Sequence, residues 1–222
     1  MSGSTLRAVL FDVDGTLVDS NDLHAEAWAQ AFSHFGFAIA VDRIRGQIGK
    51  GGDNLIPSLL PQLSDDKAEK ISDFRGDLFK RDYIDRVTAF PGVCQLFERL
   101  RAGGRAIVLA SSAKGEELEH HLDLLGCRDL VTATTSADDA ESSKPDPDIF
   151  AAALKVAKAD AGSAIVVGDT PYDIEAAAKI GLRTIAVRSG GFDDDALREA
   201  GALILVDDVA DLLARYDESP LA

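Results

Sequence analysis

The 222-residue sequence contains only two cysteines, one methionine and one tryptophan. Cys94 and Cys127 lie far apart and form neither a CxxC pair nor a ligand-spaced cluster with the four histidines. Small disulfide-stapled domains and structural zinc sites need more cysteines at closer spacing. We therefore expect neither a disulfide framework nor a structural zinc site.

Positive charge is also scarce, because 23 Lys and Arg residues stand against 38 Asp and Glu, for a net charge of −15. Phosphate backbones and anionic lipids are bound by Lys and Arg, so nucleic acid and membrane surfaces are excluded as partners. Long hydrophobic runs are absent too, since none approaches the roughly 18 residues that a bilayer span requires. We expect a cytoplasmic protein without a signal peptide, and a monomer.

Short apolar runs are present at intervals along the chain, and each is continuous rather than alternating. Such runs are typical of parallel strands that are covered on both faces. The runs are 6–11, 106–110, 164–167, 184–187 and 203–206. From about residue 90 onward they alternate with segments of helical periodicity, at 93–100, 118–125 and 149–157. This order predicts an α/β fold with a doubly wound, Rossmann-like parallel sheet.

The segment after the first apolar run reads differently. Residues 20–37 and 65–87 have helical periodicity, and no strand-like run separates them. We therefore predict a Rossmann-like core formed by 1–17 and 89–222, with an α-helical cap inserted at 18–88. A packed core is consistent with a hydrophobic content of 46% and a charged content of 27%.

Polar residues follow the predicted strands where each strand ends. Ligand sites in open parallel sheets lie at these carboxyl ends, close to the point where strand order reverses. We therefore expect side chains from four separate loops to converge there. The four segments are Asp12-Val13-Asp14-Gly15-Thr16, Ser111-Ser112-Ala113-Lys114, Ser143-Lys144-Pro145 and Gly168-Asp169-Thr170-Pro171-Tyr172-Asp173.

These four segments, in this order and spacing, resemble the haloacid dehalogenase superfamily over essentially the whole chain. The likeness is to its phosphatase and β-phosphoglucomutase-like members, which carry a helical cap after the first strand. The resemblance implies a Mg²⁺-dependent phosphatase that acts on a small phosphorylated metabolite, of the sugar phosphate or phosphoglycolate type, through an aspartyl-phosphate.

The residue types suit that chemistry. Asp12 can attack a phosphoryl group, and Asp14 can protonate the leaving alcohol and later take a proton from water. Because clustered carboxylates repel one another and the substrate, a hard cation such as Mg²⁺ is expected. Asp12, Asp14 and Asp169 are the expected ligands, with Asp173 acting in support or through water. By resemblance, Asp14 contributes its backbone carbonyl, and Ser111 and Lys144 bind the phosphoryl group.

The same motifs bear on four alternatives to hydrolysis of a phosphate ester. A dehalogenase is disfavoured, because those enzymes lack an acid at the position of Asp14. A hexose-phosphate mutase stays open, since Ser112 and Lys114 resemble the positions that bind a second phosphate in β-phosphoglucomutases. The Gly168-Asp169 and Asp173 pattern favours a phosphatase. A phosphonate hydrolase would need a cap lysine with a lowered pKa, and a non-catalytic binding module would not need the complete set of charges.

Two cap residues are candidates for substrate binding. His24 lies where mutases and many capped phosphatases carry a histidine. Lys50, in Gly49-Lys50-Gly51-Gly52, lies where the resemblance puts the substrate-specificity loop, and nothing in its glycine-rich surroundings is expected to lower its pKa. The pair His120-His121 is expected at the surface or boundary of a helix rather than at a metal site.

Overall fold

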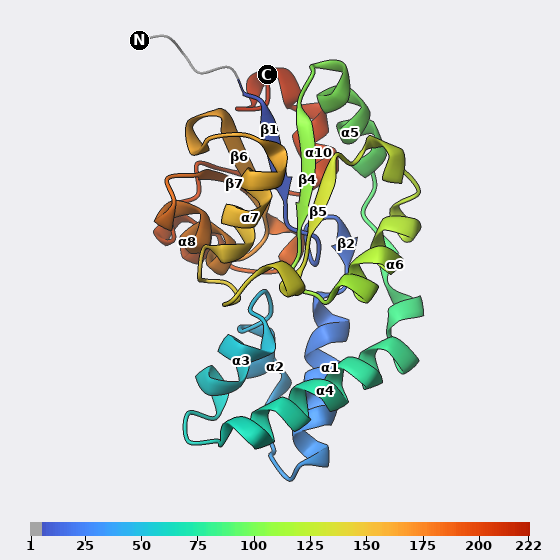
Figure 1. The fold of residues 1–222 in the computed structure, drawn as a ribbon, viewed down its shortest axis with the longest axis vertical. Coiled ribbons are helices and arrows are strands. Elements are labelled where there is room, and N and C mark those ends of the chain that lie inside the picture. The colour runs from blue at the N-terminus through green and yellow to red at the C-terminus, as the bar shows by residue number, and fades with distance from the viewer. Residues whose placement is uncertain (1–5) are drawn as a thin grey trace.

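A computed structural model describes residues 6–222, and its core is a six-stranded parallel sheet with the strand order β5-β4-β1-β6-β7-β8. The α/β fold with an inserted helical region is confirmed (Figure 1). The strands are β1 (Ala8–Phe11), β4 (Ala106–Ala110), β5 (Ala133–Thr135), β6 (Ala164–Gly168), β7 (Arg183–Val187) and β8 (Ile204–Val206). Strand β5, which has only three residues, was not predicted from the sequence.

Helices cover both faces of the sheet, and the alternation of side chains along each strand explains why. In β1, Val9 and Phe11 belong to the apolar cluster that includes side chains of α5, α6 and α10. Ala8 and Leu10 point to the opposite cluster, with side chains of α7 and α8. Both faces are therefore buried, which explains the continuous apolar runs. These helices are α5 (Val93–Ala102), α6 (Gly115–Leu125), α7 (Asp148–Ala157), α8 (Pro171–Lys179) and α10 (Val209–Ala214); α9 (Asp194–Glu199) packs near β7.

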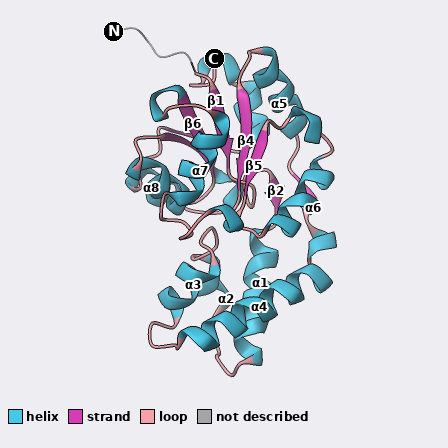
Figure 2. Cartoon of the chain, viewed as in Figure 1, coloured by secondary structure: helices cyan, strands magenta, loops and turns pink. Residues whose placement is uncertain are grey.

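The inserted region leaves and rejoins the core at one place. The short strands β2 (Val18–Asp19) and β3 (Thr88–Ala89) pair antiparallel at the base of the insertion. The expected boundaries of the cap fall in this ribbon. Between its strands lie α1 (Asn21–His34), α2 (Val41–Arg45), α3 (Gly52–Leu59) and α4 (Asp65–Asp82). Figure 2 shows these helices grouped together below the core, and the core contains the parallel strands.

The cap has an apolar cluster of its own. Trp28 and Phe32 of α1 stack on each other and pack with Leu55 of α3 and Ile71 of α4. Burial of side chains of this size stabilises by about 1.5–3 kcal/mol each. This cluster fixes the four helices as a unit beside the carboxyl ends of β1 and β4.

The expectation that the two cysteines form no disulfide was wrong. Cys94 in α5 and Cys127 after α6 form a disulfide, with their Cα atoms 5.8 Å apart. The two segments pack on the same face of the sheet, so residues distant in sequence meet there. Sequence spacing carries no information about such a contact between segments that are distant in the chain.

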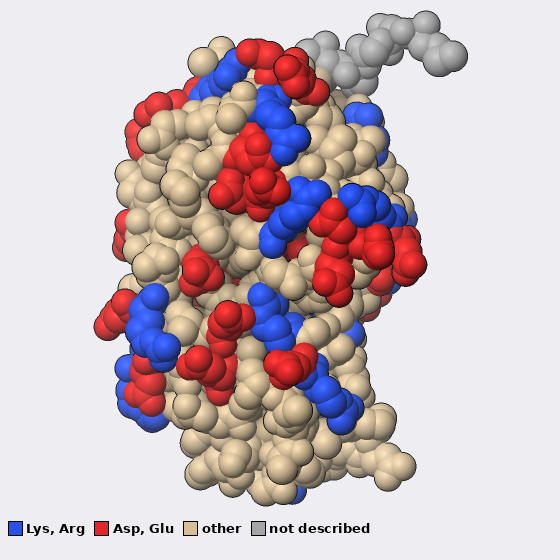
Figure 3. All heavy atoms as spheres, turned by 180° about the vertical axis from the view of Figure 1, so that it is seen from behind, with Lys and Arg blue, Asp and Glu red and all other residues tan. Residues whose placement is uncertain are grey.

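Acidic and basic side chains are interspersed on the face of the molecule seen in Figure 3, and the cap end of that view is mostly uncharged. Several surface acids are paired with cations, as Arg188 is with Asp194 and Asp207. Much of the acidic excess is therefore distributed over the surface rather than gathered at one site. Within residues 6–222, no helix combines the length and the apolarity needed to cross a bilayer.

Candidate active site

The side chains from the four loops meet at the carboxyl ends of β1, β4 and β6, next to the strand where the sheet order reverses. Residues of the first three loops line a cavity of about 490 Å³ between the core and the cap. Asp12, Asp14 and Ser111 line it from the core, and His24 and Lys50 line it from the cap. The structure therefore brings together residues that are more than 100 positions apart in the sequence.

Asp12 follows β1 and is almost fully buried. Its Oδ1 lies 2.5 Å from the Nζ of Lys144, and its Oδ2 accepts a hydrogen bond of 3.1 Å from the hydroxyl of Thr16. Two partners from different loops thus fix the plane of the carboxylate. Such restraint is what an attacking carboxylate needs for a defined direction of approach.

Asp169 follows β6 and is completely buried. Its Oδ1 accepts a hydrogen bond from Thr16 at 3.2 Å, and its Oδ2 accepts one from Asn21 at 2.8 Å. Gly15 passes close by with a φ of +77°, and a Cβ there would lie 2.3 Å from Asp169 Oδ2. Only glycine combines this left-handed backbone with so close an approach.

Asp173 occupies the third helical position of α8. Its Oδ2 accepts hydrogen bonds from the backbone N–H and the hydroxyl of Thr170, which completes a capping box. Its Oδ1 lies 2.7 Å from the Nζ of Lys144. Asp173 thus has two functions in the fold, because it starts the helix and holds the lysine that faces Asp12.

The three buried carboxylates Asp12, Asp169 and Asp173 lie within 4.8 Å of one another. Burial raises the pKa of Asp12 to about 7, although Lys144 opposes the rise. Burial and the negative charges of Asp12 and Asp173 raise the pKa of Asp169 well above its usual value. For Lys144, burial is outweighed by Asp12 and Asp173, and its pKa is raised. One lysine does not balance three acids, so this all-oxygen cluster could hold a divalent cation.

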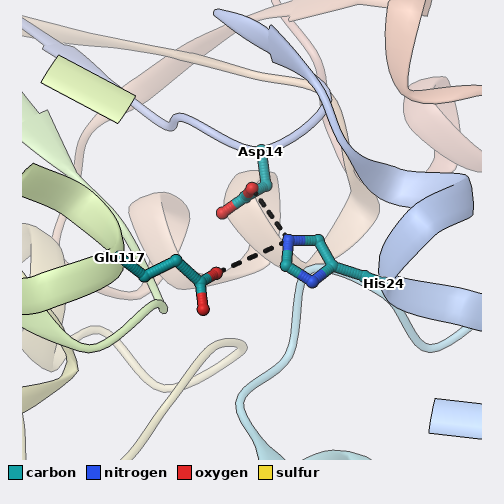
Figure 4. A group of neighbouring side chains, drawn as sticks. All are labelled: Asp14, His24 and Glu117. Atoms are coloured by element: carbon teal, nitrogen blue, oxygen red, sulfur yellow. Dashed lines mark hydrogen bonds and ion pairs between the residues drawn. The ribbon is translucent and has the colours of Figure 1, made fainter. Parts of the chain in front are cut away.

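The carboxylate of Asp14 belongs to a different group of side chains. Its Oδ1 accepts hydrogen bonds from Ser20 at 2.6 Å and from His24 Nε2 at 3.0 Å. Glu117 of α6 approaches the same Nε2 at 3.6 Å, so His24 points between two carboxylates (Figure 4). Burial alone would raise the pKa of Asp14, but His24 and Ser20 outweigh it and hold the pKa well below its ordinary value.

Arg75 of α4 determines the tautomer of His24. Its guanidinium lies 2.6 Å from His24 Nδ1, and a guanidinium can only donate. Nδ1 must then accept, which leaves the ring proton on Nε2, directed toward Asp14. The imidazole also stacks on Phe79, with 4.0 Å between the ring centroids. His24 is thus fixed against Asp14, whereas the sequence had indicated only a substrate-binding role.

His121 was expected at the surface or boundary of its helix, and this expectation was wrong. The side chain is completely buried, one turn after Glu117. Its two ring nitrogens have no hydrogen-bond partner among the described residues. Burial lowers the pKa of His121. The apolar face of α6 packs on the core, and the period of that face includes position 121.

The loop after β4 brings Ser111, Ser112 and Lys114 to the cavity. The hydroxyl oxygen of Ser111 accepts a hydrogen bond of 3.0 Å from Ala113 N–H, which orients it. Ser112 donates to the carbonyl of Gly49 at 3.3 Å and so contacts the cap. Lys114 is exposed, and its Nζ lies 3.6 Å from Asp73.

Lys50 lines the cavity, but its ammonium group is occupied within the cap. It donates to Gln47 at 2.7 Å and to Ser58 at 3.1 Å, and it lies 4.4 Å from the ring centroid of Tyr172. The expectation that nothing lowers its pKa was wrong, because partial burial lowers it. The glycine-rich sequence hid this burial, since the helix α3 begins at Gly52 and packs beside the lysine.

Four residues of the site were not assigned a function from the sequence: Thr16, Asn21, Arg75 and Glu117. Thr16 and Asn21 flank the first motif closely, so their position relative to Asp12 was a usable signal. The sequence around Glu117 and Arg75 contains no comparable signal, because charged residues on amphipathic helices are ordinarily solvated. Their burial depends on how the cap packs on the core.

Comparison with known proteins identifies the class. The family model for haloacid dehalogenase-like hydrolases matches residues 9–187, and the chain belongs to that family. The chain is 29% identical over 219 residues to the N-acetylmuramic acid 6-phosphate phosphatase of Pseudomonas putida, covering 96% of this chain and 97% of that one. It is 28% identical over 196 residues to the pyrophosphatase PpaX of Bacillus velezensis, covering 84% and 85%.

A solved structure agrees with this assignment. The crystal structure of a hydrolase from Pseudomonas syringae superimposes with a TM-score of 0.90 at 31% sequence identity, covering 96% of this chain and 98% of that one. The sheet, the helices on its two faces and the inserted helical region are thus shared with a solved hydrolase.

Proposed function

We propose that this protein is a Mg²⁺-dependent phosphatase that hydrolyses a small phosphate monoester through an aspartyl-phosphate on Asp12. One observation carries the proposal: a buried carboxylate next to a buried lysine opens onto the same cavity as a second carboxylate, Asp14, which a histidine orients. This arrangement supplies a nucleophile, a phosphoryl-binding cation and a separate acid or base.

In the first step, an oxygen of Asp12 attacks phosphorus and the bond from phosphorus to the leaving oxygen breaks. Because His24 and Ser20 hold the pKa of Asp14 low, Asp14 must first take up a proton from solvent. It then gives this proton to the leaving oxygen, so the product leaves as a neutral alcohol. In the second step, Asp14 takes a proton from water as the water oxygen attacks phosphorus. The bond from phosphorus to Asp12 then breaks, which restores the carboxylate and releases inorganic phosphate. Lys144 and Ser111 bind the oxygens of the transferring group throughout.

Asp12, Asp169 and the backbone carbonyl of Asp14 are the proposed ligands of Mg²⁺, and Asp173 supports the site through Lys144. The excess of buried negative charge fits such a cation. When bound, Mg²⁺ supplies positive charge that binds the substrate phosphate and stabilises the charge of the transferring group. The side chains of Thr16 and Asn21 then hold the carboxylates in place by their hydrogen bonds.

The walls of the cavity favour a leaving group without negative charge. Beyond Asp12 and Asp14, five acidic and four basic side chains line the cavity: Asp53, Asp73, Asp77, Glu117 and Glu141 against Lys50, Arg75, Lys80 and Lys114. Each of the four cations already has a polar partner within the protein. A sugar phosphate is therefore favoured over phosphoglycolate, pyrophosphate or a bisphosphate.

The same observation counts against the mutase alternative, which requires a second phosphate-binding site. Lys114 would supply that site, but it is exposed and lies beside Asp73. A phosphonate hydrolase would use Lys50, whose lowered pKa is favourable, but whose ammonium group is hydrogen-bonded to Gln47 and Ser58. Hydrolysis of an ordinary phosphate ester remains the better supported function.

The proposal is tested by measuring phosphate release from p-nitrophenyl phosphate, sugar phosphates, phosphoglycolate, nucleotides and phosphonates. We expect Mg²⁺-dependent release from p-nitrophenyl phosphate and faster release from one or more sugar phosphates. Asp12→Asn is expected to abolish both. Isomerisation of β-glucose 1-phosphate faster than phosphate release would support the mutase instead. A lack of activity across the whole panel would refute the proposal.

A further inference from the structure

The cap segment that follows Lys50 contacts Ser143, the residue directly before Lys144 in the core. The backbone N–H of Gly51 donates to the hydroxyl of Ser143 at 3.0 Å. The Oδ2 of Asp53 accepts a hydrogen bond of 2.9 Å from the backbone N–H of Ser143. The side-chain amide of Asn54 donates to the carbonyl of Ser143 at 2.8 Å. The cap thus forms hydrogen bonds with the backbone N–H, the hydroxyl and the carbonyl of one core residue. These three hydrogen bonds are the Ser143 contact.

The close approach explains a glycine in this segment. A Cβ on Gly51 would lie 2.7 Å from Ser143 Cβ and 2.9 Å from its hydroxyl oxygen. Real Cβ atoms do not approach so closely, so any larger residue would separate the cap from the core here. The glycine-rich sequence around Lys50 therefore serves a backbone contact.

The contact extends to the lysine itself. The amide of Asn54 also lies 3.4 Å from the backbone carbonyl of Lys144. The side chain of Lys144 is the group that contacts Asp12 and Asp173. The backbone that carries this lysine is therefore held by the cap on one side, and its ammonium group is held by the core on the other.

We propose that Asp53 and Asn54 are positioning residues, which fix the Ser143–Lys144 backbone when the cap lies against the core and so place Lys144 on the transferring phosphoryl group. This inference rests on the proposed phosphatase function. Neither residue needs to touch the phosphoryl group, because each acts through Lys144. The cap then contributes to the phosphoryl-transfer step as well as to the choice of substrate.

Hydrogen–deuterium exchange tests the contact without any reference to activity. Asp53→Leu removes the acceptor of the Ser143 N–H, and Asn54→Ala removes the donor to the Ser143 carbonyl. In both variants, exchange in the segment 141–148 is expected to be about tenfold faster than in the wild type. The control is Gln62→Ala, which removes an exposed amide side chain in the turn after α3. Unchanged exchange in both variants would overturn the contact.

Kinetics tests the positioning role. Asp53→Leu and Asn54→Ala are each expected to lower kcat for p-nitrophenyl phosphate by about tenfold, with a smaller effect on KM. Asp53→Asn keeps an oxygen that can accept the Ser143 N–H, so it is expected to restore most of kcat. A change in KM alone, or no recovery in Asp53→Asn, would assign these residues to substrate binding and overturn the positioning role. If the wild type lacks phosphatase activity, the proposed function fails, and the exchange experiment still decides the contact.

Discussion

The ammonium nitrogen of Lys144 lies 2.5 Å from Asp12 Oδ1, and both side chains are buried at the junction of the core and the cap. Breaking a buried ion pair by removing one partner leaves the other charge uncompensated. Here the uncompensated group would be the proposed nucleophile, with Asp173 beside it. Loss of this ion pair is therefore expected to lower both the stability of the folded site and the reactivity of Asp12.

Lys144→Met is expected to lower kcat/KM for any phosphate ester by about a thousandfold, because it removes the proposed phosphoryl-binding cation. It should also lower the thermal midpoint at pH 8, where the neighbouring carboxylates are charged. Lys144→Arg keeps the charge but is too large for a fully buried site beside Phe150, and is not expected to restore activity. Activity of Lys144→Met within tenfold of the wild type would contradict this role.

The function of His24 can be separated from substrate binding by the choice of leaving group. His24→Ala removes the hydrogen bond that orients Asp14, and this loss is expected to outweigh the accompanying rise in the pKa of Asp14, so hydrolysis of alkyl phosphates should slow by about tenfold or more. Release of p-nitrophenolate needs no proton, so the first step with p-nitrophenyl phosphate should be affected much less. The measurement is the rate of a single turnover for each ester. An equal effect on both esters would indicate that His24 acts on binding alone.

The raised pKa values of Asp12 and Asp169 predict how stability depends on pH. A carboxyl group whose pKa is higher in the folded state than in the unfolded state stabilises the fold at low pH and loses this contribution as pH rises. For Asp12 the loss covers the range from about 4 to about 7. The metal-free protein should therefore lose thermal stability over this range through these two groups.

Mg²⁺ should reverse that loss, because it binds the charged carboxylates of the folded protein. The increase in thermal midpoint on adding Mg²⁺ is expected to be larger at pH 8 than at pH 5. Asp169→Asn should reduce this increase and should itself stabilise the metal-free protein at pH 8. A Mg²⁺ effect that is equal at both pH values would show that these carboxylates are not the site of binding.

The charge of the cavity wall predicts selectivity between two esters that differ in one group. 2-Hydroxyethyl phosphate and phosphoglycolate have a hydroxymethyl group and a carboxylate, respectively, in the same position. We expect kcat/KM to favour the hydroxyethyl ester by about tenfold, since the leaving-group wall has more acids than bases. Equal values, or a preference for phosphoglycolate, would contradict the proposed substrate class.

The sequence predicted those parts of the site that depend on local patterns. Asp12, Ser111 and Asp169 each follow an apolar run, and the topology of a parallel sheet brings such positions together. The cap was predicted because helical periodicity replaces strand-like runs between residues 18 and 88. The three-residue strand β5 was missed although Val131 and Thr132–Thr135 include several β-branched residues, because so short a segment has little periodicity.

Contacts between distant surfaces were not predictable in this way. The burial of Glu117 and His121, the orientation of His24 by Arg75, and the disulfide of Cys94 with Cys127 all depend on how separate helices pack. Lys50 illustrates the same limit, because its glycine-rich sequence gives no sign of the partial burial beside Tyr172 that lowers its pKa. The pattern of one segment contains no information about the side chains that another segment brings to it.

The most direct test of the central claim uses Asp14→Asn with p-nitrophenyl phosphate. The leaving group needs no acid, so Asp12 should still be phosphorylated, whereas the second step lacks the base that activates water. We expect a burst of about one equivalent of p-nitrophenolate and, after acid quench, a phosphoryl group on the peptide that contains Asp12. Linear release without a burst, with Asp12 unmodified, would contradict attack by Asp12.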